Sequence, residues 1–281
     1  INYEREKIQL AKISSDRKEF VTLGNNHIDL PEIEFKKYDI LHIHWFNYSL
    51  SIDKIRLLNE KYKVVVTARD LWMFTGGCHY NLQCDLHKKK CIKCPLFKDV
   101  EIANSLYKKK LKAFEGLNII TLSKWMESFV RSSKFKCKTH QIYNSVSTKD
   151  FYRADQTSVI KELQQLNNIS NKKIILIGAI NLNSSYKGKK HIEKFIRLHR
   201  DSCFFVFFGN GSKPLTRNLK SNEYKEYGFI NSEKLNLLFN ISDFFLMLSE
   251  QEAFGKVIIE SILCNTPVIT LPNGAPEELI S

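Results

Sequence analysis

The chain has 281 residues, a length typical of two domains, and its 43% apolar and 26% charged residues are typical of a globular protein. No apolar stretch approaches the roughly 20 residues of a membrane-spanning helix, and the first residues lack the apolar core of a signal peptide, so we expect a cytoplasmic protein. The formal net charge of +13 favours phosphate-rich partners, which include nucleic acid, anionic lipid and nucleotide-linked substrates.

Four short β-runs are predicted in the first half of the chain, at residues 39–45, 63–68, 117–122 and 141–143. A helical pattern at 51–62 lies between the first two runs, and Ser123 is placed to cap a helix after the third. This β-α-β order is typical of a parallel sheet with helices packed on its faces.

A second series of strands is predicted at residues 172–180, 203–208, 227–230, 244–249 and 267–271. Helices are predicted between them at residues 188–200, 232–240 and 255–264. Several of these strands are apolar without alternation, as in a parallel sheet that is buried on both faces. The sequence therefore predicts an α/β fold with two doubly wound, Rossmann-like domains, residues 1–152 and 153–281. Ligands of such domains bind beyond the carboxyl ends of the strands.

One loop of this kind contains two carboxylates. A predicted strand ends at Ser249, and a helix begins near Gly255. The start of a helix offers unpaired N–H groups and a positive dipole end, which suit a diphosphate. Glu252 in the loop and Glu260 in the helix could accept hydrogen bonds from the hydroxyls of a sugar and a ribose on either side of that diphosphate. The alternative is that both glutamates simply face solvent.

Glu252 and Glu260, with Phe254 and Gly255 between them, resemble the E-x7-E signature of retaining glycosyltransferases with the GT-B fold, most closely glycosyltransferase family 4. Further stretches agree in order: His42-Ile43-His44-Trp45, Asp70-Leu71-Trp72, Thr75-Gly76-Gly77-Cys78-His79-Tyr80, Asn144-Ser145-Val146, Tyr186-Lys187-Gly188, Phe208-Gly209-Asn210-Gly211 and Thr266-Pro267-Val268-Ile269. The resemblance covers roughly residues 38–280 and implies two domains that face a cleft.

The resemblance implies catalytic roles for two residues: Lys187 would neutralise the departing phosphate, and Glu252 would hold hydroxyls of the donor sugar. Other donor-binding roles that it implies fall on Glu260 for the ribose, on Gly228 and Ile230 for the nucleobase, and on the backbone of Phe254, Gly255, Lys256 and Val257 for the diphosphate. Enzymes of this family need no metal for catalysis, so no catalytic metal is expected.

On the sugar and acceptor side, the residues implied are His44, Arg69, Asp70, Gly76 and Gly77. The sequence departs from the family pattern at Arg69, where many members have histidine, and at Tyr186, where many have arginine. Both ends also look short. The glycine-rich loop after the family's first strand would precede Ile1, and the last helices would follow Ser281.

A cysteine cluster lies within the segment 74–98, which we interpret as an insertion in the first domain. Its spacing is Cys78-x5-Cys84-x6-Cys91-x2-Cys94. Four thiolates can close a tetrahedral zinc site of the structural kind, so a structural zinc ion is predicted here. His79 and His87 are alternative ligands, and four reduced cysteines in a basic loop are the alternative interpretation.

The sequence thus predicts a hexosyltransferase that moves a sugar with retention from a UDP- or GDP-linked donor to a glycan or lipid-linked acceptor. Surface polysaccharide synthesis and peripheral contact with the anionic inner face of a membrane follow from the family resemblance and the basic charge. Alternatives are a catalytically inactive nucleotide-sugar-binding homologue and a zinc-bearing nucleic-acid-binding protein. Scattered lysines and arginines without a recognition motif argue against nucleic acid.

Overall fold

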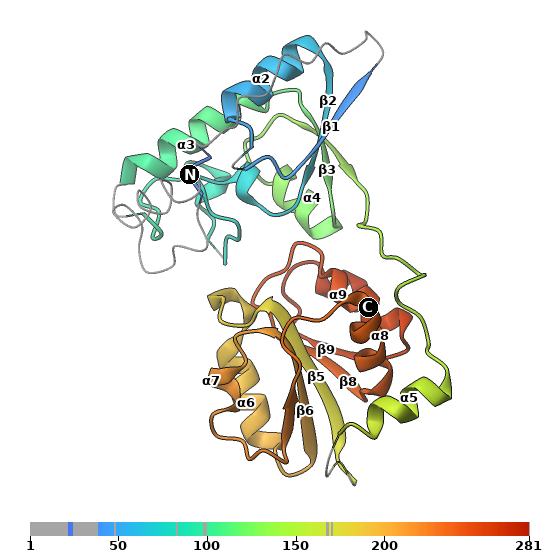
Figure 1. Ribbon diagram of the computed structural model, residues 1–281. Helices are drawn as coiled ribbons and strands as arrows, with labels where there is room; N and C mark the ends of the chain where they lie inside the picture. Colours follow the sequence, from blue (N-terminus) through green and yellow to red (C-terminus); the bar gives the residue numbers. More distant parts are fainter. Residues whose placement is uncertain are drawn as a thin grey trace. The chain divides into compact units, whose positions relative to one another are not determined.

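The computed structural model describes residues 22–24, 39–47, 49–82, 84–97, 100–166, 169 and 171–280. The chain divides into two compact units, Ile1–Tyr143 and Asn144–Ser281 (Figure 1). The division therefore falls before the boundary expected between residues 152 and 153. The reason is visible in the packing: Phe151 is buried in the core of the second unit, and the N–H of Tyr152 donates to the side chain of Asn236 at 2.9 Å.

Among its described residues, the first unit contains a four-stranded parallel sheet in the order β1-β2-β3-β4. Its strands are β1 (Ile40–His44), β2 (Lys63–Ala68), β3 (Asn118–Thr121) and β4 (Lys138–Gln141). The helices described in this unit are α2 (Ile52–Lys61), α3 (Val100–Ala113) and α4 (Lys124–Arg131), with short 3-10 turns η2 (Trp72–Phe74) and η3 (Leu86–Lys88). The predicted cap at Ser123 is confirmed, because its hydroxyl accepts from the N–H of Met126 at 3.1 Å.

The second unit contains a five-stranded parallel sheet in the order β7-β6-β5-β8-β9 (Figure 1). Its strands are β5 (Lys173–Asn181), β6 (Cys203–Asn210), β7 (Tyr224–Glu226), β8 (Phe244–Met247) and β9 (Val268–Thr270). Its helical elements are α5 (Gln156–Leu163), η4 (Ser185–Lys187), α6 (Lys189–His199), α7 (Lys213–Thr216), α8 (Ser232–Ile241), α9 (Lys256–Leu263) and α10 (Pro276–Ile280).

The apolar strands of the second unit are buried on both faces. Successive side chains of β5 alternate between two cores: Leu176 packs with residues of α8 and α9, whereas Ile177 packs with residues of α6 and α7. This arrangement explains why the strand sequences show no polar alternation. The predicted α/β fold class with two parallel sheets is confirmed.

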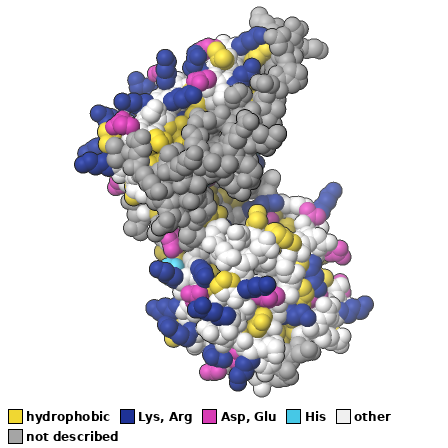
Figure 2. Space-filling view, turned by 60° about the vertical axis from the view of Figure 1, so that its left-hand side comes forward, with side chains coloured by type: hydrophobic (Ala, Val, Ile, Leu, Met, Phe, Trp, Pro, Cys, Tyr) yellow, Lys and Arg dark blue, Asp and Glu magenta, His cyan; other side chains and the backbone are white. Residues whose placement is uncertain are grey.

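Both units carry charged side chains on the face shown in Figure 2. In the face shown in Figure 2, lysines and arginines are spread over both units, with acidic side chains between them. One lysine of the run Lys108–Lys110 is not on the surface: Lys110 in α3 is fully buried, and its ammonium lies 3.4 Å from the ring centre of Trp72. None of the described helices is long and apolar enough to span a membrane.

Candidate functional site

The second unit has a cavity of about 340 Å³ at the carboxyl ends of β5 and β8. This is where a doubly wound sheet binds its ligand, and the volume is within the range of small-molecule sites. The wall is built from the end of β5, from η4, from the loop after β8 and from the start of α9. Five residues of the predicted donor site line it: Lys187, Glu252, Gly255, Lys256 and Val257.

A close backbone contact positions the loop that carries Lys187. Gly188 has a left-handed conformation with φ of 69°, and a Cβ atom there would lie 1.6 Å from the carbonyl oxygen of Leu248. Only glycine allows this approach. The N–H of Glu250 also donates to the carbonyl of Tyr186 at 2.7 Å. These contacts hold η4 against the end of β8 and bring Lys187 beside a residue 65 positions later in the chain.

That residue is Glu252. Its Oε1 atom lies 2.6 Å from Nζ of Lys187, and the two side chains are 10% and 19% exposed. Burial disfavours the charged lysine, but the neighbouring carboxylate outweighs burial and raises the pKa of Lys187 above its usual value. Lys187 is therefore a cation at neutral pH. The cavity thus offers the cation of Lys187 for a phosphate and the carboxylate of Glu252 for hydroxyls.

Helix α9 begins at Lys256, directly after Gly255 in a left-handed conformation with φ of 82°. Within the described residues no side chain caps this start, so the N–H groups of the first turn are available to an anion. One turn further, Glu260 is 6% exposed, and its Oε1 atom lies 3.5 Å from Nζ of Lys256. Burial raises the pKa of Glu260, and Lys256 opposes this shift only in part.

Four other predicted donor residues do not line the cavity: Phe254, Glu260, Gly228 and Ile230. The side chain of Phe254 is buried. Gly228 accepts at its carbonyl oxygen from the N–H of Gly209 at 2.6 Å, so it lies at the carboxyl end of β6. The roles of these four residues toward ribose, diphosphate and nucleobase stay predictions.

In the first unit, polar residues gather at the carboxyl ends of β1 and β2. Nδ1 of His44 lies 3.2 Å from Nη2 of Arg69, and the rings of His42 and His44 are 4.0 Å apart. Burial lowers the pKa of His44, and its electrostatic interactions with His42 and Arg69 lower it further. A neutral His44 can accept a hydrogen bond from the guanidinium of Arg69.

Asp70 organises the next layer of this site. Oδ1 accepts from the N–H of Trp72, and Oδ2 lies 2.8 Å from Nδ1 of His79. The other ring nitrogen of His79 shares a hydrogen bond with the hydroxyl of Thr22, and the Trp45 ring stacks on the imidazole at 5.5 Å. Both nitrogens of His79 are thus engaged in hydrogen bonds, and its alternative role as a zinc ligand stays a prediction.

A small hollow beside Asp70 contains a residue that the sequence did not single out. Asn47 is 5% exposed, and within the described part of the chain neither polar atom of its amide has a hydrogen-bond partner. It lines the hollow together with Trp45, Arg69 and Asp70. Buried amides are almost always paired, so this one indicates a place for water or for a polar ligand group. The only feature of the sequence that could have indicated a functional role for Asn47 was its position directly after β1.

Gly76 and Gly77, predicted on the acceptor side, lie in packed surroundings and do not line this hollow. A Cβ atom at Gly76 would lie 2.6 Å from the carbonyl oxygen of Ala103 and 2.7 Å from Cβ of Cys91. Gly77 has φ of 129°, a conformation that other residues rarely adopt. The visible role of both glycines is close packing against α3 and the cysteine segment.

The four cysteines of the predicted zinc site, Cys78, Cys84, Cys91 and Cys94, are free thiols. Burial raises the pKa of Cys78 to about 12 and that of Cys91 to about 11, and neighbouring thiols add to both shifts. Among the described residues, no group of three or more His, Cys, Asp or Glu side chains is arranged to hold a metal ion. Zinc at these cysteines therefore stays a prediction from their spacing.

Residues 157–281 match the family model described as glycosyl transferases group 1. N-acetyl-alpha-D-glucosaminyl L-malate synthase from Bacillus anthracis is 27% identical over 143 residues, which are 48% of this chain and 36% of that protein. The chain thus spans about a third of the length of this relative. The family match confirms the predicted resemblance for the second unit.

Solved structures share the fold. Sucrose-phosphate synthase from Thermosynechococcus elongatus superposes with a TM-score of 0.64 at 18% identity, over 87% of this chain and 58% of that one. HepE from Anabaena, in complex with UDP-glucose, gives a TM-score of 0.62 at 17% identity, over 87% and 62% of the two chains. The chain spans about three fifths of these proteins and shares their two-sheet GT-B fold.

Proposed function

We propose that this protein, whose second unit belongs to the group 1 glycosyl transferases, moves a hexose-type sugar from a UDP- or GDP-linked donor to a glycan or lipid-linked acceptor with retention of configuration. The observation that carries the proposal is the pair of Lys187 and Glu252 in a cavity at the start of α9. The family match supports a sugar transfer. Neighbours whose structures hold UDP-glucose or UDP support a nucleotide-sugar donor.

Each group of the cavity has a task in this reaction. The N–H groups at the start of α9 bind the diphosphate, and Lys187 neutralises the charge that grows on it as the glycosidic bond breaks. Glu252 accepts hydrogen bonds from sugar hydroxyls. Without a donor, the lysine and the carboxylate satisfy each other at 2.6 Å. Donor binding separates this pair by offering a phosphate to the cation and hydroxyls to the carboxylate.

The acceptor binds to the first unit in this proposal. The unpaired amide of Asn47 and the carboxylate of Asp70 line the same hollow, and the exposed face of Trp45 lies at its rim. The hollow has a volume of about 10 Å³, room for one water molecule, so a sugar hydroxyl would reach the Asn47 amide by replacing that water, and the indole of Trp45 is suited to the apolar face of a sugar ring. The basic charge supports a further part of the proposal, namely a lipid-linked acceptor at the anionic inner face of a membrane.

A panel of nucleotide-sugars tests the donor site directly by thermal shift and calorimetry. The right donor at 100 times its Kd should stabilise the protein by about 2.7 kcal/mol. Lys187→Ala should then lower turnover by about 10²–10³ and weaken ground-state donor binding much less, because its charge acts mainly in the transition state. Lys161→Ala, an exposed lysine of α5, is the matched control and should leave both quantities unchanged.

Two results would contradict this proposal. One is a protein that binds no nucleoside diphosphate at millimolar concentration. The other is a Lys187→Ala variant that transfers sugar at the original rate. Donor binding without any transfer would favour the inactive homologue instead, a function suggested by Arg69 where related enzymes often have histidine. In this structure Arg69 is engaged with His44.

A further inference from the structure

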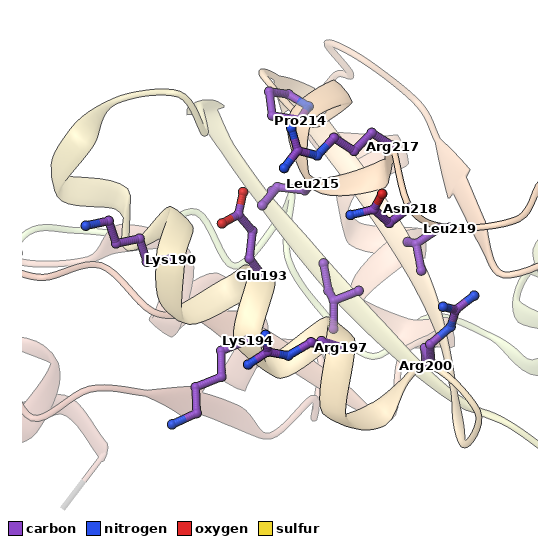
Figure 3. Close-up of a pocket in the computed structure, with 11 residues that line it drawn as sticks. Lys190, Glu193, Lys194, Arg197, Arg200, Pro214, Leu215, Arg217, Asn218 and Leu219 are labelled. Atoms are coloured by element: carbon purple, nitrogen blue, oxygen red, sulfur yellow. The ribbon is translucent and has the colours of Figure 1, made fainter.

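The second unit has another cavity, of about 320 Å³, on the face of the sheet that α6 and α7 cover (Figure 3). It shares no lining residue with the donor cavity. Its floor is apolar and consists of Ile196, Leu215 and Leu219. Figure 3 shows the residues of α6 on one side of the recess and Pro214, Arg217 and Asn218 on the other.

The walls of this α6–α7 pocket are strongly basic. Its lining includes five cations and the single carboxylate of Glu193; the cations are Lys190, Lys194, Arg197, Arg200 and Arg217. The first three follow the helix spacing i, i+4, i+7, so they lie along one side of α6. Arg217 follows α7 and supplies a guanidinium from the opposite wall.

Few of these charges are neutralised within the protein. Arg200 contacts Glu223 at 3.1 Å, and the carboxylate of Glu193 lies 4.0 Å from Lys189. In the described part of the chain, Lys190, Lys194, Arg197 and Arg217 form no ion pair. Like charges three and four positions apart destabilise a helix, and Lys190, Lys194 and Arg197 have this spacing. A bound anion would remove this repulsion.

We propose that the α6–α7 pocket binds a phosphate group that carries two negative charges, on a soluble molecule or on a lipid headgroup. Guanidinium groups on facing walls can each donate two parallel hydrogen bonds to phosphate oxygens, and the lysines add point charges. A recess with an apolar floor holds a discrete group, which distinguishes it from a flat basic surface. The proposal does not depend on the donor site.

Pyrophosphate is the probe for the soluble source, followed by NMR of backbone amides in the whole protein. Amides of residues 189–219 report on the α6–α7 pocket, and those of residues 255–263 report on the donor site. The double variant Lys194→Glu, Arg197→Glu should bind pyrophosphate at the pocket about tenfold more weakly or worse, because two attractions become repulsions. Unchanged shifts at residues 255–263 would show that the variant is folded.

The control is the double variant Arg153→Glu, Lys161→Glu, which makes the same charge change on exposed residues. These residues lie just before α5 and within it, and α5 covers the other face of the sheet. The control should bind pyrophosphate like the original protein. Glu193→Gln should tighten binding. Flotation with phosphatidylcholine vesicles, with and without phosphatidic acid, measures binding to a lipid phosphate. The phosphate is on a lipid if the original protein floats only with phosphatidic acid and the variant Lys194→Glu, Arg197→Glu loses this binding while the control keeps it. The proposal is overturned if pyrophosphate shifts no amide of residues 189–219 and the protein does not float with the vesicles, or if both double variants respond alike.

Discussion

Two buried polar side chains close to the candidate sites lack some of the hydrogen bonds or ion pairs that would offset the cost of their burial. A substitution at such a residue can raise the stability of the fold and weaken ligand binding at the same time. Asn47 in the first unit has no partner for either amide atom within the described residues. Glu260 in the second unit is buried with one lysine at 3.5 Å. A buried polar group without its hydrogen bonds costs free energy of folding, so a ligand that supplies the bonds gains affinity.

For Asn47 we predict that the variant Asn47→Leu is more stable and binds acceptor less well. An apolar side chain of similar volume removes an unpaired amide, which should raise the free energy of unfolding by about 1–2 kcal/mol. Urea denaturation and the KM for acceptor measure the two effects. Asn104→Ala removes another buried amide with an unpaired oxygen, away from the hollow, and should leave KM unchanged. An acceptor KM that Asn47→Leu does not alter would exclude the hollow as an acceptor site.

Glu260 gives a prediction about pH. Its pKa is raised in the folded protein, so the ionised carboxylate opposes folding once the pH has risen through this pKa. Glu260→Gln should therefore be more stable than the original protein at pH 7. The difference should vanish as the pH falls below the unperturbed glutamate pKa of about 4.3, where the carboxyl is protonated in both states. Urea denaturation of both proteins at pH 7 and below about pH 4.3 measures this difference in the free energy of unfolding. A difference that grows on acidification would show that Glu260 stabilises the fold as an anion.

At the scale of elements, the donor cavity depends on the contact between η4 and the end of β8. We predict that Gly188→Ala displaces this contact, destabilises the protein by about 2–4 kcal/mol and abolishes donor binding, because the new Cβ would overlap the Leu248 carbonyl. Gly116 has nearly the same φ, 70°, and a Cβ atom there would have no neighbouring atom within 4 Å. Gly116→Ala should cost only the conformational strain, about 1 kcal/mol, and keep donor binding. Equal losses in the two variants would refute the steric explanation.

The sequence placed the strands rich in apolar residues close to their observed bounds, the edge strands β1 and β9 included, and it placed the polar edge strands β4 and β7 least accurately. β4 was expected at 141–143 and lies at Lys138–Gln141; β7 was expected at 227–230 and lies at Tyr224–Glu226. Both are edge strands with one hydrogen-bonded neighbour, and their residues are largely polar. The apolar residues that attracted the prediction follow each strand. Buried apolar side chains make a strand recognisable in the sequence, and these two polar edge strands lack that signal.

Helix α3 was missed for a related reason. Its lysine-rich end looks like a solvated segment, yet Lys110 is buried, with its ammonium donating to the carbonyls of Trp72 and Thr75. Burial drives the pKa of Lys110 well below its usual value, although nearby Asp70 and thiols oppose the shift. A side chain that is polar at its tip and apolar along its stem is assigned to the surface by any hydropathy pattern.

The same contrast applies to the sites. Lys187 and Glu252 were predicted because a motif marks each of them, and the structure brings them to 2.6 Å. The sequence did not predict the unpaired amide of Asn47 or the hydrogen bond between Asp70 and His79. Both features depend on which side chains the fold brings next to these residues. Tertiary pairing has no local sequence signature.

On the scale of the whole molecule, each unit has its own parallel sheet, and the chain passes from one to the other near residue 144. The predicted zinc site lies wholly in the first unit, and the donor cavity lies wholly in the second. Metal binding and nucleotide binding should therefore stabilise different parts of the chain, since each ligand stabilises only the structure that binds it.

We predict one tightly held zinc ion per chain at the four cysteines, measurable as about one equivalent by metal analysis of protein purified without a nickel column. Four thiolates leave no open position for water, so the metal should stabilise residues 74–98 and take no part in transfer. Replacing Cys91 and Cys94 with serine should release the metal and speed hydrogen exchange across this segment. Cys137→Ser, a partly buried cysteine outside the segment, is the control.

Binding of UDP or GDP should survive in the serine double variant, because the donor cavity has no residue in the first unit. Native protein without metal, in which all four thiols react freely, would refute the zinc site. A folded double variant that lost nucleotide binding would instead show that the two units are energetically coupled. Hydrogen exchange separates these cases, because coupling would loosen residues 255–263 together with residues 74–98, whereas independent units would loosen residues 74–98 alone.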